Sequence, residues 1–268
     1  MLANPPERFT GRVESYRRCR PRYPGAIVDL LRRECRLGED AAVVDVAAGT
    51  GLLTEIFLAA GFGVTAVEPN AEMREACAEL GRSYPKLRVV EGMAEGTGLR
   101  ARSADLITVA QAMHWFDLER TRAEFARILK PGGCCAVIYN NRRMDGDAFH
   151  EAYEQFLLKF GVDYESVKRQ HVEGDRMTQF FAPGEMRCAS FANEQTLDRE
   201  GFEGRVLSSS YIPRPGHERF GEMRTEITRL FEEYQSGGVV TIEYECVVCY
   251  GELSEASELA SQRISVLL

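Results

Sequence analysis

The sequence predicts an α/β protein built on a doubly wound, largely parallel sheet. Up to residue 141, short apolar segments alternate with helical ones, as buried parallel strands and their crossover helices do. In addition, VVDVAAGTG (43–51) runs from an apolar strand into a glycine-rich turn, and VTAVEPN (64–70) carries Glu68 at the end of the next strand. This order is typical of a nucleotide-binding βαβ unit whose second strand presents a carboxylate to ribose hydroxyls.

The expected elements of this first part follow in chain order. Residues 25–37 read as a helix with Ile27, Leu30 and Leu31 on one face. Short apolar segments then predict five buried strands, near 42–47, 63–68, 87–91, 104–110 and 134–140. Helices are expected between them, near 51–60, 71–81 and 119–129. In such a sheet the ligand crevice lies at the carboxyl ends of the strands.

After Asn141 the pattern changes to long amphipathic helices. Aromatic and aliphatic residues recur at helical spacing from Phe149 to Phe160, and again from Met223 to Tyr234. Strands are expected at 186–193 and 207–212, a short helix from Leu197, and a last strand at 239–250 that pairs antiparallel. We therefore expect one Rossmann-like domain over 1–268 with seven strands, mostly parallel, and helical cap insertions at 142–185 and 213–236 above the crevice.

Composition is that of a soluble globular enzyme. The 268 residues are 44% hydrophobic and 28% charged, and no apolar run is long enough to span a membrane. A net charge of −8 disfavours binding to a phosphate backbone, so neither nucleic acid nor membrane is expected as a partner. The start MLANPPERF does not resemble a signal sequence, which makes the cytoplasm the default location. Oligomeric state stays open.

Eight cysteines are scattered along the chain, and we interpret them as reduced core residues. Cys246 and Cys249 form a CxxC within an expected strand, where a three-residue offset sends the side chains to opposite faces. No second CxxC or histidine pair completes a four-ligand set, so no metal site is expected.

The glycine turn separates two classes of nucleotide ligand. A dinucleotide fingerprint would place a third glycine at Thr54, and it is absent. Asp45, inside the end of the first strand, can face a cationic group, for which a dinucleotide has little use. A tight turn with no ligand is the alternative, and Glu68, 17 residues past Gly51, weakens it.

Further motifs make the chain resemble the class I S-adenosylmethionine-dependent methyltransferases. ILKPGG (128–133) is similar to the family's turn into its fifth strand, DLITVAQAMHWFD (105–117) to its fourth strand and following loop, and VVEGMAEGTGL (89–99) to its adenine-flanking segment. The opening SYRRCRPRYP (15–24) resembles the N-terminal lid of the small-molecule subgroup related to trans-aconitate methyltransferase, and RVLSSSYIP (205–213) also fits that subgroup. The resemblance covers roughly 7–253, with 1–24 as the lid.

The resemblance implies that S-adenosylmethionine is held at the glycine turn. Glu68 would accept both ribose hydroxyls and Asp45 the cofactor's ammonium, directly or through water. Gly49 would allow close approach, with Gly51 and Pro69 beside it. Ala47 replaces the more usual first glycine, a modest departure that is tolerable if φ stays negative there.

At the adenine end the subgroup often has an acidic or small polar residue where this chain has Met93. Met93 would pack on the ring while the Ala94 N–H contacts a ring nitrogen; simple core filling by Met93 is the alternative, and Glu95 is expected to be solvated.

The end of the fourth strand is expected to face the methyl acceptor. Gln111 would border the methionine moiety, with His114 and Trp115 toward the substrate. His114 is the candidate general base if the nucleophile carries a proton, and would only orient a carboxylate. A packing histidine and a core-anchoring tryptophan are the alternatives.

The N-terminal segment carries five arginines within eleven residues, most simply a solvated face. The resemblance implies lid roles for Tyr16, Arg20 and Tyr23 over cofactor and substrate. Inward-turned arginines, with Arg142 as a further pocket candidate, would favour a carboxylate-bearing substrate.

We therefore expect methyl transfer to a small molecule. The alternatives are a protein or nucleic-acid methyltransferase, against which AQAMHW (110–115) lacks the [D/N]-P-P-[Y/F/W] motif, and a non-catalytic cofactor binder.

Overall fold

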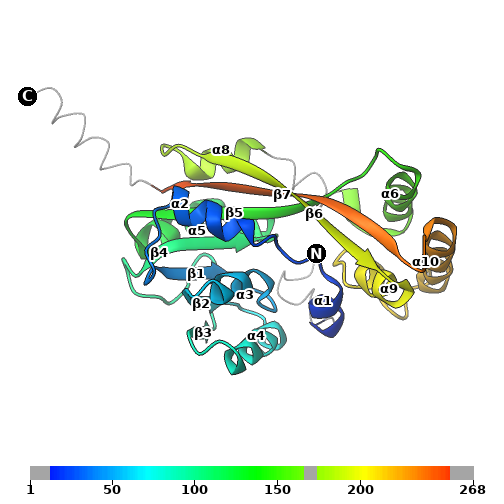
Figure 1. Ribbon diagram of the computed structural model, residues 1–268, viewed down its shortest axis with the longest axis horizontal. Coiled ribbons are helices and arrows are strands. Elements are labelled where there is room, and N and C mark those ends of the chain that lie inside the picture. Colours follow the sequence, from blue (N-terminus) through cyan, green and yellow to red (C-terminus); the bar gives the residue numbers. More distant parts are fainter. Residues whose placement is uncertain (1–12, 166–173, 254–268) are drawn as a thin grey trace, which may run out of the picture. The chain divides into compact units, whose positions relative to one another are not determined.

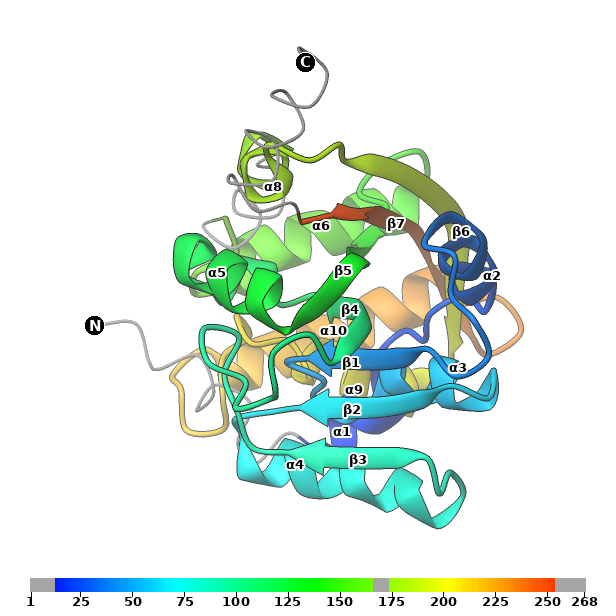
Figure 2. The same cartoon turned by 90° about the vertical axis from the view of Figure 1, so that its left-hand side faces the viewer.

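A seven-stranded sheet in the order β3-β2-β1-β4-β5-β7-β6 organises the protein (Figures 1 and 2). The computed structural model describes residues 13–165 and 174–253, without the side chains of 14–16, 174 and 175. The strands are β1 Ala42–Val46, β2 Gly63–Val67, β3 Leu87–Val90, β4 Ala104–Ala110, β5 Leu129–Arg142, β6 Arg187–Leu197 and β7 Val240–Glu252. The first five are parallel and β7 is antiparallel, which confirms the predicted fold class.

The helices lie largely where the periodicity predicts them. They are α1 Val13–Cys19, α2 Ala26–Glu34, α3 Leu52–Ala59, α4 Ala71–Ala78, α5 Leu118–Ile128, α6 Ala148–Phe160, α8 Gly174–Phe181, α9 Arg199–Leu207 and α10 Phe220–Tyr234, with short 3₁₀ turns η2 Glu79–Arg82 and η3 Met113–Trp115. Polar side chains begin several of them. Asn70, Asp117 and Asp147 each accept a backbone N–H from the first turn of α4, α5 and α6.

Contacts divide the chain into two compact units. The parallel-sheet unit comprises the described residues 24–139, 174–190 and 247–253, and the helical unit comprises 13–23, 140–165 and 191–246. Each unit has its own apolar core. In the parallel-sheet unit, strands β1, β4 and β5 pack with α5 and α8 around Phe125. In the helical unit, α6, α9 and α10 pack around Tyr153 and Phe202.

The helices of the expected insertions belong to different units. α6 and α10 lie in the helical unit, whereas α8 packs in the parallel-sheet unit, where Arg122 Nε donates to the Phe180 carbonyl at 3.0 Å. The cap position of 142–185 and 213–236, and the single-domain organisation, stay predictions.

The expected strand at 207–212 is wrong, because a helix end occupies this segment. Asp198 accepts the Gly201 N–H and starts α9, which runs through Leu207. Beyond it, the Ser208 N–H donates to the Gly204 carbonyl and the Ser209 N–H to the Val206 carbonyl. These bonds use the backbone groups that a strand would need for a ladder.

The interpretation of all cysteines as reduced is also wrong, since Cys188 and Cys249 form a disulfide. They lie on the neighbouring strands β6 and β7, and are 61 residues apart in sequence. Cys246 is buried on the other face of β7, as the three-residue offset predicts.

Candidate cofactor site

Three residues of the turn after β1 have a positive φ, a backbone conformation that L-residues rarely adopt. Ala47, Gly49 and Gly51 have φ of +56°, +59° and +87°. The condition of a negative φ at Ala47 is therefore not met, and this L-residue carries the left-handed cost of about 1–2 kcal/mol. Strain of this kind persists where the surrounding structure holds the backbone in place, and it is concentrated at ligand sites.

Glu68 closes this turn from the neighbouring strand. Val46 of β1 pairs with Val67 of β2, so the turn and Glu68 lie at the same edge of the sheet. The Gly49 N–H donates to Glu68 Oε2 at 2.8 Å, and the Asn70 N–H donates to Oε1 at 2.9 Å. Burial raises the pKa of Glu68, although these backbone donors oppose the shift. Each oxygen keeps a lone pair, so the carboxylate is oriented and still able to accept ligand hydroxyls.

Asp45 is a buried carboxylate held by two hydroxyl groups. It is 1% exposed, and its oxygens accept from Thr54 Oγ1 at 2.6 Å and Thr108 Oγ1 at 2.9 Å. Burial raises its pKa to about 6, with the two threonines opposing the shift and the charge of Glu68 adding to it. No arginine, lysine or histidine pairs with Asp45 among the described residues. A cationic ligand group near Asp45 would lower the cost of its negative charge.

The turn fits the ribose and amino-acid ends of S-adenosylmethionine. A Cβ at Gly49 would meet nothing within 4 Å, so open space lies beside this backbone. Thr50 is 3% exposed, and its Oγ1 has no hydrogen-bond partner among the described residues. Native proteins rarely leave such a buried hydroxyl unpaired, which points to a bound group as its partner. Gly51 differs, because a Cβ there would lie 2.6 Å from Leu80 Cδ1.

The expected adenine segment is a tight loop with Met93 on its surface. Met93 is 53% exposed, so its interpretation as core filling is wrong; it makes an isolated bridge with Gly96. Ala94 is buried. A Cβ at Gly92 would lie 2.8 Å from Val67 Cγ1, so close packing against β2 requires glycine there. Glu95 is not simply solvated, because it accepts the Asp117 N–H at 2.9 Å.

Beyond β4 the chain turns sharply at Gln111, whose φ is +55° and whose N–H donates to the Ile138 carbonyl at 3.0 Å. His114 and Trp115 follow on η3, with ring centroids 4.5 Å apart. Both rings are half-buried, and Trp115 packs on the core of the parallel-sheet unit.

Pro69, the residue after Glu68, is half-buried, and its carbonyl accepts a hydrogen bond from Arg74 at 3.0 Å.

The expected lid and pocket residues lie in the helical unit. The side chain of Tyr16 lies outside the described residues. Arg20 Nη2 donates to the Ser208 carbonyl at 2.7 Å, which ties the end of α1 to the end of α9, and Tyr23 is half-buried. Arg142 is buried against Glu154, with Tyr164 Oη 3.1 Å from its guanidinium. The protein itself thus supplies a carboxylate to Arg142, and a substrate role for it stays a prediction.

Arg205 is a buried charge that the sequence reasoning missed. It is 6% exposed, and it donates from Nε to Tyr244 Oη at 3.2 Å and from Nη1 to Ser209 Oγ at 3.1 Å. A signal was present in the sequence. Arg205 stands three residues after Phe202 and one before Val206, on the apolar side of a helix where an arginine is out of place.

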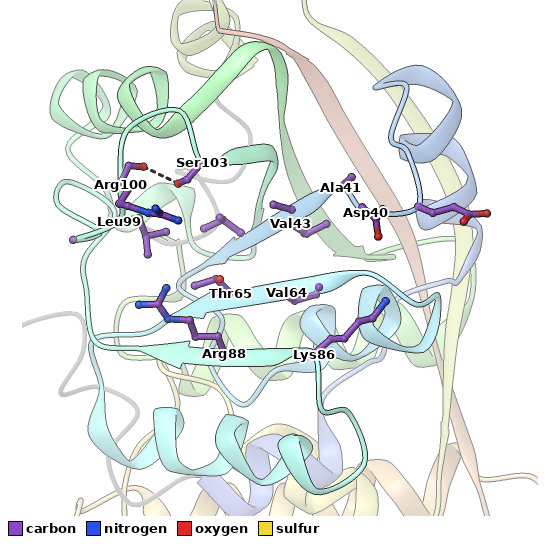
Figure 3. A pocket seen from close by; sticks show the side chains of 15 residues that line it. Asp40, Ala41, Val43, Val64, Thr65, Lys86, Arg88, Leu99, Arg100 and Ser103 are labelled. Atoms are coloured by element: carbon purple, nitrogen blue, oxygen red, sulfur yellow. Dashed lines mark hydrogen bonds between the residues drawn. The ribbon is translucent and has the colours of Figure 1, made fainter.

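A separate cavity of about 510 Å³ lies over the amino halves of β1, β2 and β3 (Figure 3). Arg88 and Arg100 lie at one end of it, and Lys86 and Asp40 at the other. The cofactor residues follow the carboxyl ends of the same strands, so this cavity is not part of the candidate cofactor site.

In residues 13–165 and 174–253, no group of three or more histidine, cysteine or acidic side chains is placed to hold a metal ion. The helices described there are all too short or too polar to cross a membrane.

Known proteins resemble this chain over the same elements. The family model described as "Methyltransferase domain" matches residues 44–137. An uncharacterized methyltransferase-like protein of Schizosaccharomyces pombe is 32% identical over 255 residues, which cover 92% of this chain and 96% of that protein. The chain belongs to the class I S-adenosylmethionine-dependent methyltransferases.

Of two further similar proteins, one matches only part of this chain, and the other shows similarity of fold alone. An uncharacterized methyltransferase of Mycobacterium tuberculosis is 38% identical over 135 residues, 50% of this chain and 52% of that protein, so the match spans about half the length of that methyltransferase. A structure from Anaeromyxobacter dehalogenans, described as a type II methyltransferase, superposes with a TM-score of 0.62 at 23% identity over 87% of this chain and 98% of the other.

Proposed function

We propose that this methyltransferase transfers the methyl group of S-adenosylmethionine to a small molecule. The observation that carries the proposal is the arrangement at the carboxyl ends of β1 and β2. Glu68 is oriented by the backbone of the turn, and Asp45 is buried without a cation among the described residues. Bound there, the cofactor supplies an electrophilic sulfonium methyl group.

The residues of the turn would hold this cofactor. Glu68 accepts the ribose hydroxyls, Asp45 faces the ammonium, and Thr50 Oγ1 gains the partner that it lacks. Gln111, Met93 and Ala94 are assigned to the methionine and adenine ends on the family resemblance. The protein's task is then to align the acceptor and exclude water.

A small-molecule acceptor is supported by the net charge of −8 and by the resemblance of 15–24 and 205–213 to the trans-aconitate methyltransferase subgroup. His114 is the candidate base for an acceptor that carries a proton, and for a carboxylate it only orients. On the family resemblance, Tyr23, Trp115 and Arg142 are the candidate acceptor residues, and Tyr16 and Arg20 are candidate cofactor residues. Cytoplasmic location is part of the same proposal.

Calorimetric titration of S-adenosylhomocysteine into the full chain tests the cofactor half of the proposal. We expect saturable binding and a raised melting temperature. No heat and no thermal shift would rule out a working cofactor site.

A turnover assay tests the acceptor half. Release of S-adenosylhomocysteine is measured with trans-aconitate and other small carboxylic acids, and separately with RNA, DNA and denatured protein. Turnover with the small acids is expected. Turnover only with a polymer would replace the small-molecule assignment, and cofactor binding without turnover on any acceptor would favour the non-catalytic alternative.

A further inference from the structure

Arg205 lies in the interior of the helical unit with only neutral partners. Its Nε donates to Tyr244 Oη, and its Nη1 donates to Ser209 Oγ. Within the described residues, no aspartate or glutamate pairs with it. A guanidinium does not lose its proton at accessible pH, so Arg205 cannot avoid the cost of burial by becoming neutral. Burying such an ion without a counter-charge costs several kcal/mol.

A second buried arginine of the same unit shows the contrast. Arg142 is paired with Glu154, and Tyr164 Oη donates to the same carboxylate at 2.6 Å. The chain therefore supplies a carboxylate of its own beside Arg142. At Arg205 it supplies hydroxyl groups instead.

The surroundings hold the Arg205 side chain in a defined position. Its helix ends directly afterwards, where Ser208 Oγ donates to the Arg205 carbonyl at 2.7 Å. Tyr244 comes from β7, and its hydroxyl also donates to Gln195 of β6 at 3.3 Å. The guanidinium is thus fixed from α9, β6 and β7 before any ligand arrives, which lowers the entropy cost of binding.

We propose that Arg205 is an oxyanion-binding site of the helical unit and takes a carboxylate or a phosphate group of a small molecule. Two of its five N–H groups donate to Ser209 and Tyr244, and a bidentate contact with an oxyanion uses two others. The anion then supplies the charge that the helical unit does not. The inference goes beyond the proposed function, since it concerns a ligand site within the helical unit alone.

The test measures binding of charged and uncharged probes to the full chain saturated with S-adenosylhomocysteine. The probes are glutarate, citrate and benzoate, with phenyl phosphate as the phosphate arm and glutaramide and benzamide as uncharged matches. The variants are Arg205→Met, Arg205→Lys and the control Arg199→Met, which changes an exposed arginine at the start of the same helix.

For the wild type we expect at least one charged probe to bind about tenfold or more tightly than its amide. Arg205→Met should abolish that difference, and Arg205→Lys should reduce it about tenfold because lysine lacks the planar fork. Arg199→Met should leave it within about twofold. Which arm binds, carboxylate or phosphate, identifies the oxyanion.

Two results would overturn the inference. In one, no charged probe binds the wild type better than its amide. In the other, Arg205→Lys, or Arg205→Met where it folds, binds the charged probes as the wild type does. A purely structural arginine would show itself by a lowered melting temperature of Arg205→Met with probe affinities unchanged. Failure of S-adenosylhomocysteine to bind the wild type is a separate outcome, and it counts against the proposed function.

Discussion

Asp45 in the parallel-sheet unit and Arg205 in the helical unit are buried charges of opposite sign in matching surroundings. Asp45 is 1% exposed and accepts from two threonine hydroxyls, and Arg205 is 6% exposed and donates to two hydroxyls. In the described residues, neither has an oppositely charged partner. Asp45 therefore carries a charge that a bound cation could compensate, and Arg205 one that a bound anion could compensate.

The two charges differ in how they respond to the absence of a ligand. Asp45 can bind a proton, and burial raises its pKa to about 6. Arg205 has no such route and stays charged. The charge of Asp45 is therefore expected to change with pH, whereas the charge of Arg205 is not.

The largest expected effect is a loss of stability when the ion pair between Arg142 and Glu154 is broken. Glu154→Gln removes the carboxylate beside Arg142 and leaves a second uncompensated cation in the helical unit. We expect the free energy of unfolding to fall by about 3–5 kcal/mol, measured by urea denaturation. Glu151→Gln, on the exposed side of the same helix, is the control, with an expected change within about 0.5 kcal/mol. An equal, small change in both variants would show that this ion pair adds no stability.

The second-largest expected effect is on the affinity for the cofactor product. Glu68→Gln replaces one acceptor oxygen with an amide that cannot accept the N–H of Gly49 or Asn70 and the ribose hydroxyls together. We expect the affinity for S-adenosylhomocysteine to fall about 100-fold, which is about 2.7 kcal/mol by calorimetry. Glu75→Gln, an exposed position on α4, should bind as the wild type does. Unchanged affinity of Glu68→Gln would remove Glu68 from the site.

The pH dependence tests the charge of Asp45. Burial raises the pKa of Asp45 from its ordinary value of 3.8 to about 6, so its stability contribution is present below about pH 4 and is lost as the pH rises through about 6. The loss amounts to about 3 kcal/mol in the ligand-free protein. Affinity for S-adenosylhomocysteine should change oppositely, falling about tenfold per unit below about pH 6 because the protonated acid no longer attracts the ammonium.

Asp45→Asn should flatten both profiles and raise the stability of the ligand-free protein near neutral pH. The Glu68→Gln variant separates the contribution of its neighbour, whose pKa is also raised by burial. A wild-type affinity that stays constant as the pH falls through this range would contradict a contact between Asp45 and a cation.

The smallest effect concerns the hydroxyl of Thr50. Because Oγ1 has no partner in the described part of the chain, Thr50→Val should change the free energy of unfolding by less than about 0.5 kcal/mol and weaken S-adenosylhomocysteine several-fold. Thr121→Val removes another buried, unpartnered hydroxyl on α5 and should leave cofactor affinity unchanged. Equal cofactor affinity in the two variants would show that Thr50 Oγ1 does not meet the ligand.

Much of the parallel-sheet unit was predictable because its signals are local. The five parallel strands and the turn between Val46 and Leu52 follow from apolar runs and glycines that are adjacent in sequence. The positive φ of Ala47 was not predictable. Alanine favours negative φ, so its presence in the sequence does not reveal that neighbouring residues hold the backbone in a strained conformation.

The helical unit was less predictable. The segment 207–212 ends on Tyr211 and Ile212, residue types that favour strands, and the bonds that end α9 override this preference. In the parallel-sheet unit, the pairing of Cys188 with Cys249 was not predictable either, because it depends on which strands of the sheet are neighbours, and separate sequence segments do not specify that order.

The sequence by itself determined the α/β fold, the methyltransferase family and the acids Asp45 and Glu68, because these depend on short motifs whose order along the chain is their order in the βαβ unit. The tertiary structure decided which buried charges are compensated. Glu154 reaches Arg142 across a dozen residues, and Tyr244 reaches Arg205 across 39. Compensation depends on distances between side chains from separate elements, and only packing sets those distances.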